Sequence, residues 1–152
     1  MTQTKTPSPA TQRQGWMAIL ARASAEDLSA LLAALDPLPE AETLRAPETG
    51  LVMVRGRAGG DGEAFNLGEM TVTRCALRLG PHIGHAYIAG RDHAKARLAA
   101  LPDAALQDSA LHHACMEAVV EPLAAAQQAA RAAEARKAAA TRVDFFTMAT
   151  MR

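Results

Sequence analysis

The sequence predicts an α+β fold with N-terminal helices, a small antiparallel β-meander sheet and a long alanine-rich helical arm at the C-terminus. Three observations support this class: apolar residues at helical spacing before Pro37, alternating runs within residues 51–90, and an alanine-rich helical pattern that extends to Arg142. Helices on both sides of a block of strands are typical of α+β proteins. We divide the chain into a flexible N-terminus at 1–10, an α+β domain at 11–105, and a C-terminal helical arm at 106–152 that ends in an interaction motif.

Two helices are predicted after a polar lead-in that contains prolines, MTQTKTPSP at residues 1–9. The first begins near Thr11, and its apolar stripe consists of Trp16, Ile19, Leu20 and Ala23. Ser24 caps the second helix, with Asp27 three residues later in its first turn. Pro37 ends this helix because proline has no N–H to donate and its ring clashes with the preceding turn.

An antiparallel hairpin is predicted in the middle of the chain. A short extended piece around residues 43–45 leads to the alternating run LVMVRGR at 51–57, and a second strand spans about 69–79. The intervening AGGDGE, at 58–63, contains enough glycine to allow positive φ in a tight turn.

One further strand and more helices complete the predicted order. GPHIGH at 80–85 predicts a turn, HAYIAG at 85–90 predicts the third strand, and a helical pattern begins at Arg91. The pattern is helical again from about 109 to 142, where Pro122 marks a break or the start of a new segment.

Composition and charge restrict the partners and the compartment. Sixteen Lys and Arg residues balance sixteen Asp and Glu residues, so neither nucleic acid nor an anionic membrane attracts the chain over a distance. Only 3% of the residues are aromatic, and this scarcity of large side chains favours stabilisation by a protein partner. Cys75 and Cys115 are too few for a disulfide framework, and we find neither a signal-peptide pattern nor an apolar run of roughly 18–20 residues. We therefore expect a cytoplasmic protein.

The glycine-rich RAGGDGE at 57–63 admits two interpretations. Such loops can point backbone amides at a phosphate, and nearby arginines support that reading. A phosphate loop of the usual kind leads into a helix and ends in GK[ST], whereas this loop joins two predicted strands. We favour a hairpin turn, with Gly60 and Gly62 at positive φ, and keep a phosphate or partner contact as the alternative.

Metal and catalytic sites are both disfavoured by the pattern. His82 and His85 are spaced HxxH, and His112, His113 and Cys115 form HHxC, but adjacent helical residues point about 100° apart and no orienting carboxylate is evident. No serine or cysteine lies in a nucleophile elbow with a histidine nearby. We predict no metal site and no catalytic residue in this chain.

Two groups of residues are candidates for contacts beyond the fold. The candidate functional or interface polar residues are Arg45, Glu48, Thr49, Gly59, Gly60, Gly62, Glu63 and Arg74. The arm is poor in large apolar residues from 124 to 140 and then ends in RVDFFTM. We therefore expect the aromatic pair Phe145 and Phe146 to be buried against another surface. The candidate partner-docking residues are Arg142, Val143, Asp144, Phe145, Phe146 and Met148. The alternative to partner docking is a solvent-exposed helix that ends in an exposed apolar segment.

Several sequence blocks, in order, resemble PhnG, the G subunit of the carbon–phosphorus lyase system with which bacteria take phosphorus from phosphonates. The blocks are RQGWM at 13–17, RAPETGLV at 45–52, GGDGEAF at 59–65, TVTRCALRL at 71–79, GRD at 90–92 and RVDFFTM at 142–148. The resemblance extends from about Thr11 to Met148, and RVDFFTM is its most distinctive piece.

The resemblance implies a place in a multi-subunit enzyme. Family members assemble with PhnH, PhnI and PhnJ into a core complex with two copies of each. With PhnH, PhnI and PhnL they support transfer of the ribose 5-triphosphate unit of ATP to a phosphonate such as methylphosphonate, which releases adenine and gives α-D-ribose 1-methylphosphonate 5-triphosphate. Displacement of adenine is attributed to PhnI, and radical cleavage of the carbon–phosphorus bond to the iron–sulfur subunit PhnJ. ATP and Mg are therefore implied as the substrate and ion of the complex, with no cofactor on this chain alone.

Three functional hypotheses stay open at this point. The first is a structural and positioning subunit of that transferase, with activity of the single chain uncertain. The second is a phosphate-ester-binding domain or small independent enzyme that uses the loop Gly59–Glu63. The third is an interaction protein in an unrelated assembly.

Overall fold

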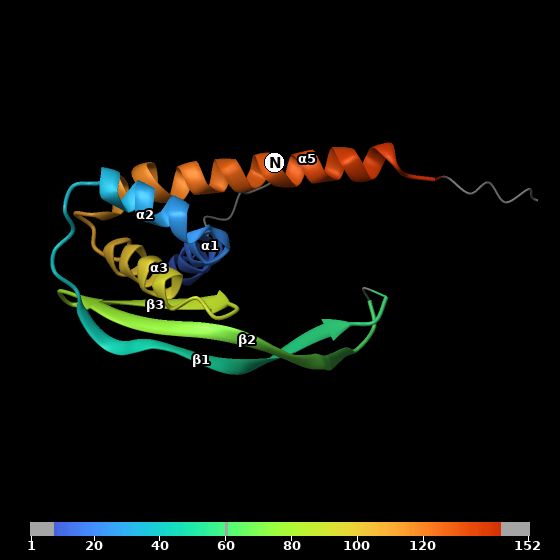
Figure 1. Ribbon diagram of the computed structural model, residues 1–152, viewed down its shortest axis with the longest axis horizontal. Helices are drawn as coiled ribbons and strands as arrows, with labels where there is room; N and C mark the ends of the chain where they lie inside the picture. The colour runs from blue at the N-terminus through green and yellow to red at the C-terminus, as the bar shows by residue number, and fades with distance from the viewer. Residues whose placement is uncertain (1–7, 60, 144–152) are drawn as a thin grey trace, which may run out of the picture.

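The computed structural model describes residues 8–59 and 61–143, in which helices lie on one face of a three-stranded antiparallel sheet (Figure 1). The strand order is β1-β2-β3, so β1 and β3 are the edge strands. The predicted α+β class is confirmed. The elements are α1 (Pro9–Arg22), α2 (Ala25–Ala34), β1 (Glu42–Arg57), β2 (Ala64–Leu79), β3 (His82–Ala89), α3 (His93–Ala105), α4 (His112–Cys115), the π-helical turn η1 (Met116–Val120) and α5 (Glu121–Ala140).

Side-chain caps fix the start of the first two helices. Ser8 Oγ accepts from Thr11 N at 3.3 Å and Pro9 occupies the first turn, so α1 begins slightly before the predicted Thr11. Ser24 Oγ accepts from Asp27 N at 2.9 Å, which confirms the predicted cap of α2. Residues 1–7 of the predicted flexible N-terminus lie outside the described part of the chain.

The strands of the sheet are longer than the sequence suggested. The extended piece at 43–45 and the run at 51–57 form one strand of 16 residues, and β2 begins at Ala64 rather than near 69. The prediction of a turn over 80–85 is wrong, because His82 already pairs with Leu79 and only Gly80 and Pro81 make the turn. Pairing between strands compensates for residues that look like turn formers in isolation.

The core lies between the sheet and the helices. Its fully buried large side chains include Leu20 and Leu28 from the N-terminal helices and Ile88 from β3. A row of buried alanines on α3 allows this helix to approach β3 closely at Gly84, where a Cβ would overlap Ala100 O and lie 2.6 Å from Ala104 N. Close packing here depends on small residues rather than on large ones.

The segment after α3 also contributes to the core. Leu106, Cys115, Val119, Val120 and Leu123 are buried. Beyond Leu123 no described residue of α5 is fully buried, although Gln127 Nε2 donates to Ile19 O at 2.8 Å. Pro122 lies in the first turn of α5 and follows η1 without a break in the helical path. The division of the chain at residue 105 stays a prediction, and the part of α5 that projects from the core begins after Gln127.

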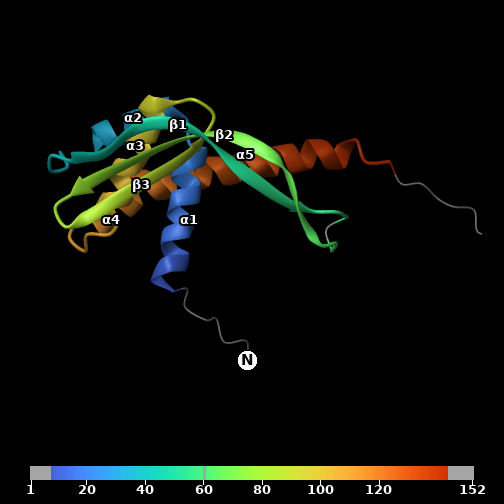
Figure 2. The same ribbon diagram turned by 90° about the horizontal axis from the view of Figure 1, so that it is seen from below.

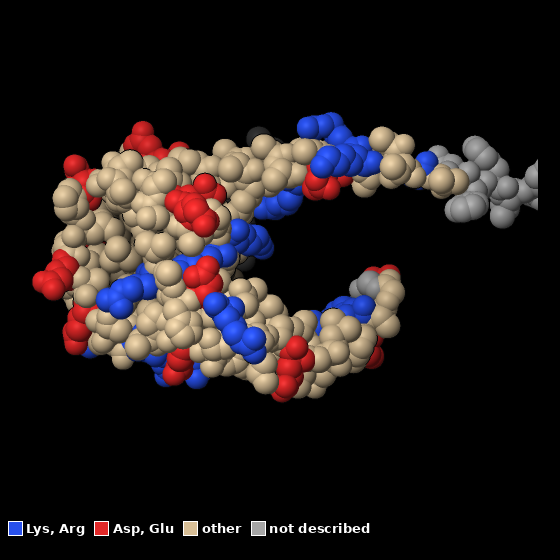
Figure 3. Space-filling view, in the orientation of Figure 1, with Lys and Arg blue, Asp and Glu red and all other residues tan. Residues whose placement is uncertain are grey.

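Two elements extend away from the core on the same side of the molecule. The β1–β2 hairpin continues past the end of β3, and α5 runs above it (Figures 1 and 2). The space-filling view is hollowed between them, and Lys and Arg side chains border the hollow on both sides (Figure 3). Within the described residues, no helix has the length and apolar character needed to cross a membrane.

Candidate functional site

Three of the predicted polar candidates form one charged cluster across β1 and β2. Glu48 pairs with Arg74 in the strand register, and Arg74 Nε donates to Glu48 Oε1 at 2.6 Å. Arg45 Nη1 donates to the same oxygen at 3.2 Å. Two guanidinium groups on one carboxylate leave the cluster with a net positive charge. All three side chains are 43–50% exposed, so the cluster is accessible to a partner and adds little stability.

This charged cluster lies on the face of the sheet opposite the helices. Arg74 is paired with Tyr87, and Ala76 with His85, so their side chains share that face. A shallow cavity of about 350 Å³ lies there, and its lining includes Arg45, Arg74, His85 and Tyr87. Two arginines beside aromatic and imidazole groups suit binding of an anionic or carboxylate-bearing partner. Cys75 also lines the cavity, and its buried thiol donates to Arg45 O at 3.4 Å.

Thr49 lies on the other face of β1, away from the charged cluster. Its Oγ1 is 3.0 Å from Nε2 of His93, the first residue of α3. The next helical residues are held by Asp92, whose Oδ1 accepts from Lys95 N at 2.8 Å. Thr49 therefore joins the hairpin to α3, and the structure separates it from Glu48, its neighbour in sequence.

The glycine-rich loop is a hairpin turn between β1 and β2. Positive φ occurs at Gly59, at 62°, whereas Gly62 does not have positive φ and Gly60 lies outside the described residues. The prediction for Gly62 is therefore corrected: its requirement is steric, because a Cβ there would lie 2.6 Å from Ala58 O. Arg57 Nη1 donates to Gly62 O at 3.1 Å and braces the turn, and Glu63 is exposed. A strand follows, so no helix N-terminus adds to an anion site.

The end of the arm is only partly described. α5 ends at Ala140, Thr141 Oγ1 bonds to carbonyls of the last turn, and Val143 is 69% exposed. Arg142 also belongs to the described part. The remaining predicted docking residues, Asp144, Phe145, Phe146 and Met148, lie outside it.

The histidines and cysteines that suggested a metal have other contacts. His112 Nδ1 is 2.6 Å from Leu106 O, and its ring packs edge-on against Trp16. His113 lies 3.6 Å from Glu117 on the exposed face of the same turn. Among the described residues, no three His, Cys, Asp or Glu side chains are placed to hold a metal ion.

Both thiols are buried and shifted toward the protonated form. Burial raises the pKa of Cys115 to about 11. Burial also raises the pKa of Cys75, and the positive charge of Arg97 partly opposes that shift. Neither cysteine has the electropositive, exposed surroundings of a reactive thiol.

One buried charged residue was missed by the sequence reasoning. Asp103 is fully buried and accepts from Arg13 at 2.7 Å, from Trp16 Nε1 at 2.8 Å and from His85 N at 2.8 Å. It connects α1, α3 and β3. The only available signal was RQGWM itself, since its arginine and tryptophan are two of the three donors.

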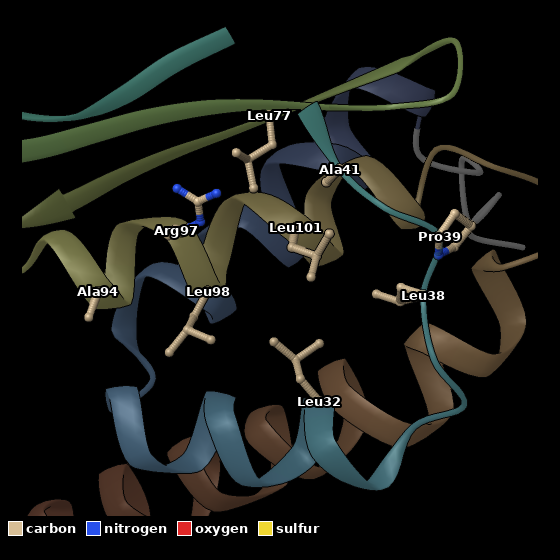
Figure 4. A pocket seen from close by; sticks show the side chains of 9 residues that line it. All are labelled: Leu32, Leu38, Pro39, Ala41, Leu77, Ala94, Arg97, Leu98 and Leu101. Atoms are coloured by element: carbon tan, nitrogen blue, oxygen red, sulfur yellow. The ribbon is translucent and has the colours of Figure 1, made fainter. Parts of the chain in front are cut away.

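An apolar cavity of about 570 Å³ was also not predicted (Figure 4). Leucines from α2, from the segment after it and from α3 point into it, and Arg97 lies on its wall. Arg97 Nη2 donates to Thr43 Oγ1 at 3.0 Å. The leucine pattern alone is indistinguishable from an ordinary core face, so sequence reasoning could not find the opening.

Comparison with known proteins gives two results. The family model described as phosphonate metabolism protein PhnG matches residues 11–150. A protein of Rhizobium meliloti (strain 1021), named alpha-D-ribose 1-methylphosphonate 5-triphosphate synthase subunit PhnG, is 51% identical over 138 residues. The alignment covers 90% of this chain and 88% of that relative.

Proposed function

Because this chain belongs to the PhnG family of phosphonate metabolism proteins, we propose that it is a positioning subunit of a cytoplasmic α-D-ribose 1-methylphosphonate 5-triphosphate synthase. The observation that carries the proposal is 51% identity, over most of both chains, to a protein named as a subunit of that synthase. The full reaction transfers the ribose 5-triphosphate unit of ATP to methylphosphonate and releases adenine. ATP is its substrate.

The proposed division of labour leaves the chemistry to other subunits. The proposed partners are PhnH, PhnI and PhnJ, two copies of each in the core complex, with PhnL for the transfer step. The described residues of this chain offer an exposed charged cluster and two projecting elements, and these suit binding to other proteins. Among the described residues, no group of three or more His, Cys, Asp or Glu side chains is placed to hold a metal ion without further ligands. No step of the proposal runs through a metal on this chain.

A genetic and biochemical experiment tests the proposal. Deletion of the gene should abolish growth on methylphosphonate as sole phosphorus source, and the intact gene should restore it. The tagged chain should co-purify with PhnH, PhnI and PhnJ when all are expressed together. Growth without the gene, or purification of the chain alone, would show that it is not a subunit of this synthase. ATP binding by the purified single chain would instead favour the phosphate-ester-binding alternative.

We further propose that RVDFFTM docks into PhnI through its aromatic pair. Aromatic side chains in a desolvated pocket are typical hot spots, each worth about 2 kcal/mol or more when truncated. A double change of Phe145→Ala and Phe146→Ala should leave the circular dichroism of the chain unchanged and abolish co-purification with PhnI. Met151→Ala is the matched control, because it removes an apolar side chain from the same segment outside the motif. If the isolated double variant unfolds while the isolated wild-type chain is a stable monomer, the two phenylalanines belong to the core of this chain and the docking proposal is wrong.

A further inference from the structure

The two edges of the sheet differ in how their backbone groups are used. On the outer edge of β3, Ile83 O accepts from Arg13 Nη2 at 2.9 Å and from Gln107 Nε2 at 2.8 Å. On the same edge, His85 N donates to Asp103 Oδ2 at 2.8 Å. Side chains from α1, from α3 and from the segment after α3 therefore occupy backbone groups that an incoming strand would need over residues 83–85, which is a common way to protect an edge strand.

The outer edge of β1 is protected only over its first residues. The register with β2 shifts between Thr43 and Arg45 and again between Arg45 and Glu48, so β1 carries two irregularities there. Pro47 lies in the second one and has no N–H to donate. From Glu48 to Val54 the register is continuous. A third shift lies between Val54 and Arg55, but its extra residue is Leu67 of β2, so β1 itself continues to Arg57. Within the described residues no strand is paired with the outer edge of β1.

The regular part of β1 also has an exposed side-chain stripe of defined chemistry. The odd-numbered residues from 51 to 57 are exposed and the even-numbered residues are half-buried, so one face carries Leu51, Met53, Arg55 and Arg57. Leu51 is 63% exposed and Met53 is 52% exposed. Among the described residues, no carboxylate forms an ion pair with Arg55 or Arg57.

This stripe faces the hollow beneath α5. Thr49 is two residues before Leu51, so both side chains point to the same face of β1. Thr49 contacts His93 of α3, and the stripe therefore continues the face that α3 covers. The hairpin extends beyond α3 with α5 on the same side of it (Figure 1). Beyond residue 130, α5 carries Arg131, Arg136 and Lys137 against one carboxylate, Glu134. An acidic occupant is therefore favoured on both sides of the hollow.

We propose that the outer edge of β1, from Glu48 to Arg57, pairs with an extended segment of another subunit of the same synthase. In this arrangement the segment places apolar side chains beside Leu51 and Met53, and carboxylates beside Arg55 and Arg57. Backbone hydrogen bonds supply affinity and the alternating stripe supplies selectivity, as in other cases of strand addition. This inference rests on the proposed function, because the partner is a subunit of that complex.

Hydrogen exchange tests the pairing directly. Amide exchange is compared between the full-length chain alone and the same chain purified in complex with the other subunits. Strand addition should slow exchange by about tenfold or more at alternate amides within residues 50–57, because only the N–H groups that point away from β2 gain hydrogen-bond partners. The amide of His85 in β3 should change much less, since it already donates to Asp103 Oδ2. Unchanged exchange at 50–57 in an assembled complex would overturn the inference and leave the proposed function standing.

A charge reversal tests the chemistry of the partner segment. Arg55→Glu should weaken co-purification with the other subunits by about fivefold to tenfold, and more strongly at low salt, because it opposes a carboxylate. Arg22→Glu is the matched control, with the same change in charge at an exposed arginine at the end of α1, outside the hairpin. Equal effects of the two variants, or none for Arg55→Glu, would overturn the inference. A wild-type chain that fails to assemble would overturn the proposed function as well.

Discussion

The buried carboxylate of Asp103 should be the most sensitive polar group in the fold. Replacement by alanine removes the acceptor for Arg13 Nε at 3.2 Å, Arg13 Nη2 at 2.7 Å, Trp16 Nε1 at 2.8 Å and His85 N at 2.8 Å. Asp103 is fully buried, whereas the side chain of Arg13 is 31% exposed. Arg13 can therefore turn toward water, but the buried indole N–H of Trp16 cannot.

The expected decrease in the free energy of unfolding of the Asp103→Ala variant follows from these contacts. Breaking a buried ion pair by removing one partner costs about 3–5 kcal/mol. The partial exposure of Arg13 favours the lower end of that range, and the buried indole N–H of Trp16, left without an acceptor, prevents a much smaller value. A loss of about 3 kcal/mol corresponds to a fall in Tm of roughly 6–12 °C for a chain of this size. Most of the native structure should persist at 25 °C, since domains are typically stable by about 5–15 kcal/mol.

Urea unfolding of the full-length chain provides the assay. Trp16 is the only tryptophan, so its fluorescence reports on this contact while circular dichroism reports on the helices. Glu48→Ala is the control, because it removes a carboxylate that is 47% exposed and should cost less than about 1 kcal/mol. If Asp103→Ala is no more destabilising than Glu48→Ala, the argument that this carboxylate connects α1, α3 and β3 is wrong.

Four further outcomes are expected. Gly84→Ala should lower the free energy of unfolding by about 1–3 kcal/mol, measured by urea denaturation, because α3 must move away from β3; an unchanged value would contradict the close approach. Gly62→Val should weaken folding or assembly through its clash with a backbone carbonyl, and a folded, assembled variant that has lost phosphonate turnover would assign the turn to an active site. Arg74→Ala should leave Tm within about 2 °C yet reduce assembly or turnover, and normal turnover would remove Arg74 from the candidate site. Burial raises the pKa of Cys115 from 9.0 to about 11, so stability is retained below pH 9 and is lost as the pH rises toward 11. The loss is up to about 2–3 kcal/mol, and denaturation of Cys115→Ala across this range should show a shallower fall.

Local features of the sequence determined the element types and the family. The cap at Ser24, the alternation in LVMVRGR and the position of the glycine-rich hairpin turn depend on residues a few positions apart, and all three were found in the structure, although Gly62 does not have the predicted positive φ. The resemblance to PhnG rested on the order of short blocks and needed no knowledge of their contacts. The match over residues 11–150 confirms it.

Tertiary structure decided the features that depend on residues far apart in the chain. His82 belongs to a strand because Leu79 pairs with it, and β2 begins at Ala64 because Arg57 lies opposite. Asp103 can be buried because Arg13, 90 positions away, brings a positive charge to it and because Trp16 and His85 N also donate to its carboxylate. Desolvating a carboxylate is unfavourable without such a partner, and no local pattern records where the partner will be. For the same reason, the sequence singled out Glu48 and Arg74 as separate candidates, and the pairing of β1 with β2 joined them into one cluster.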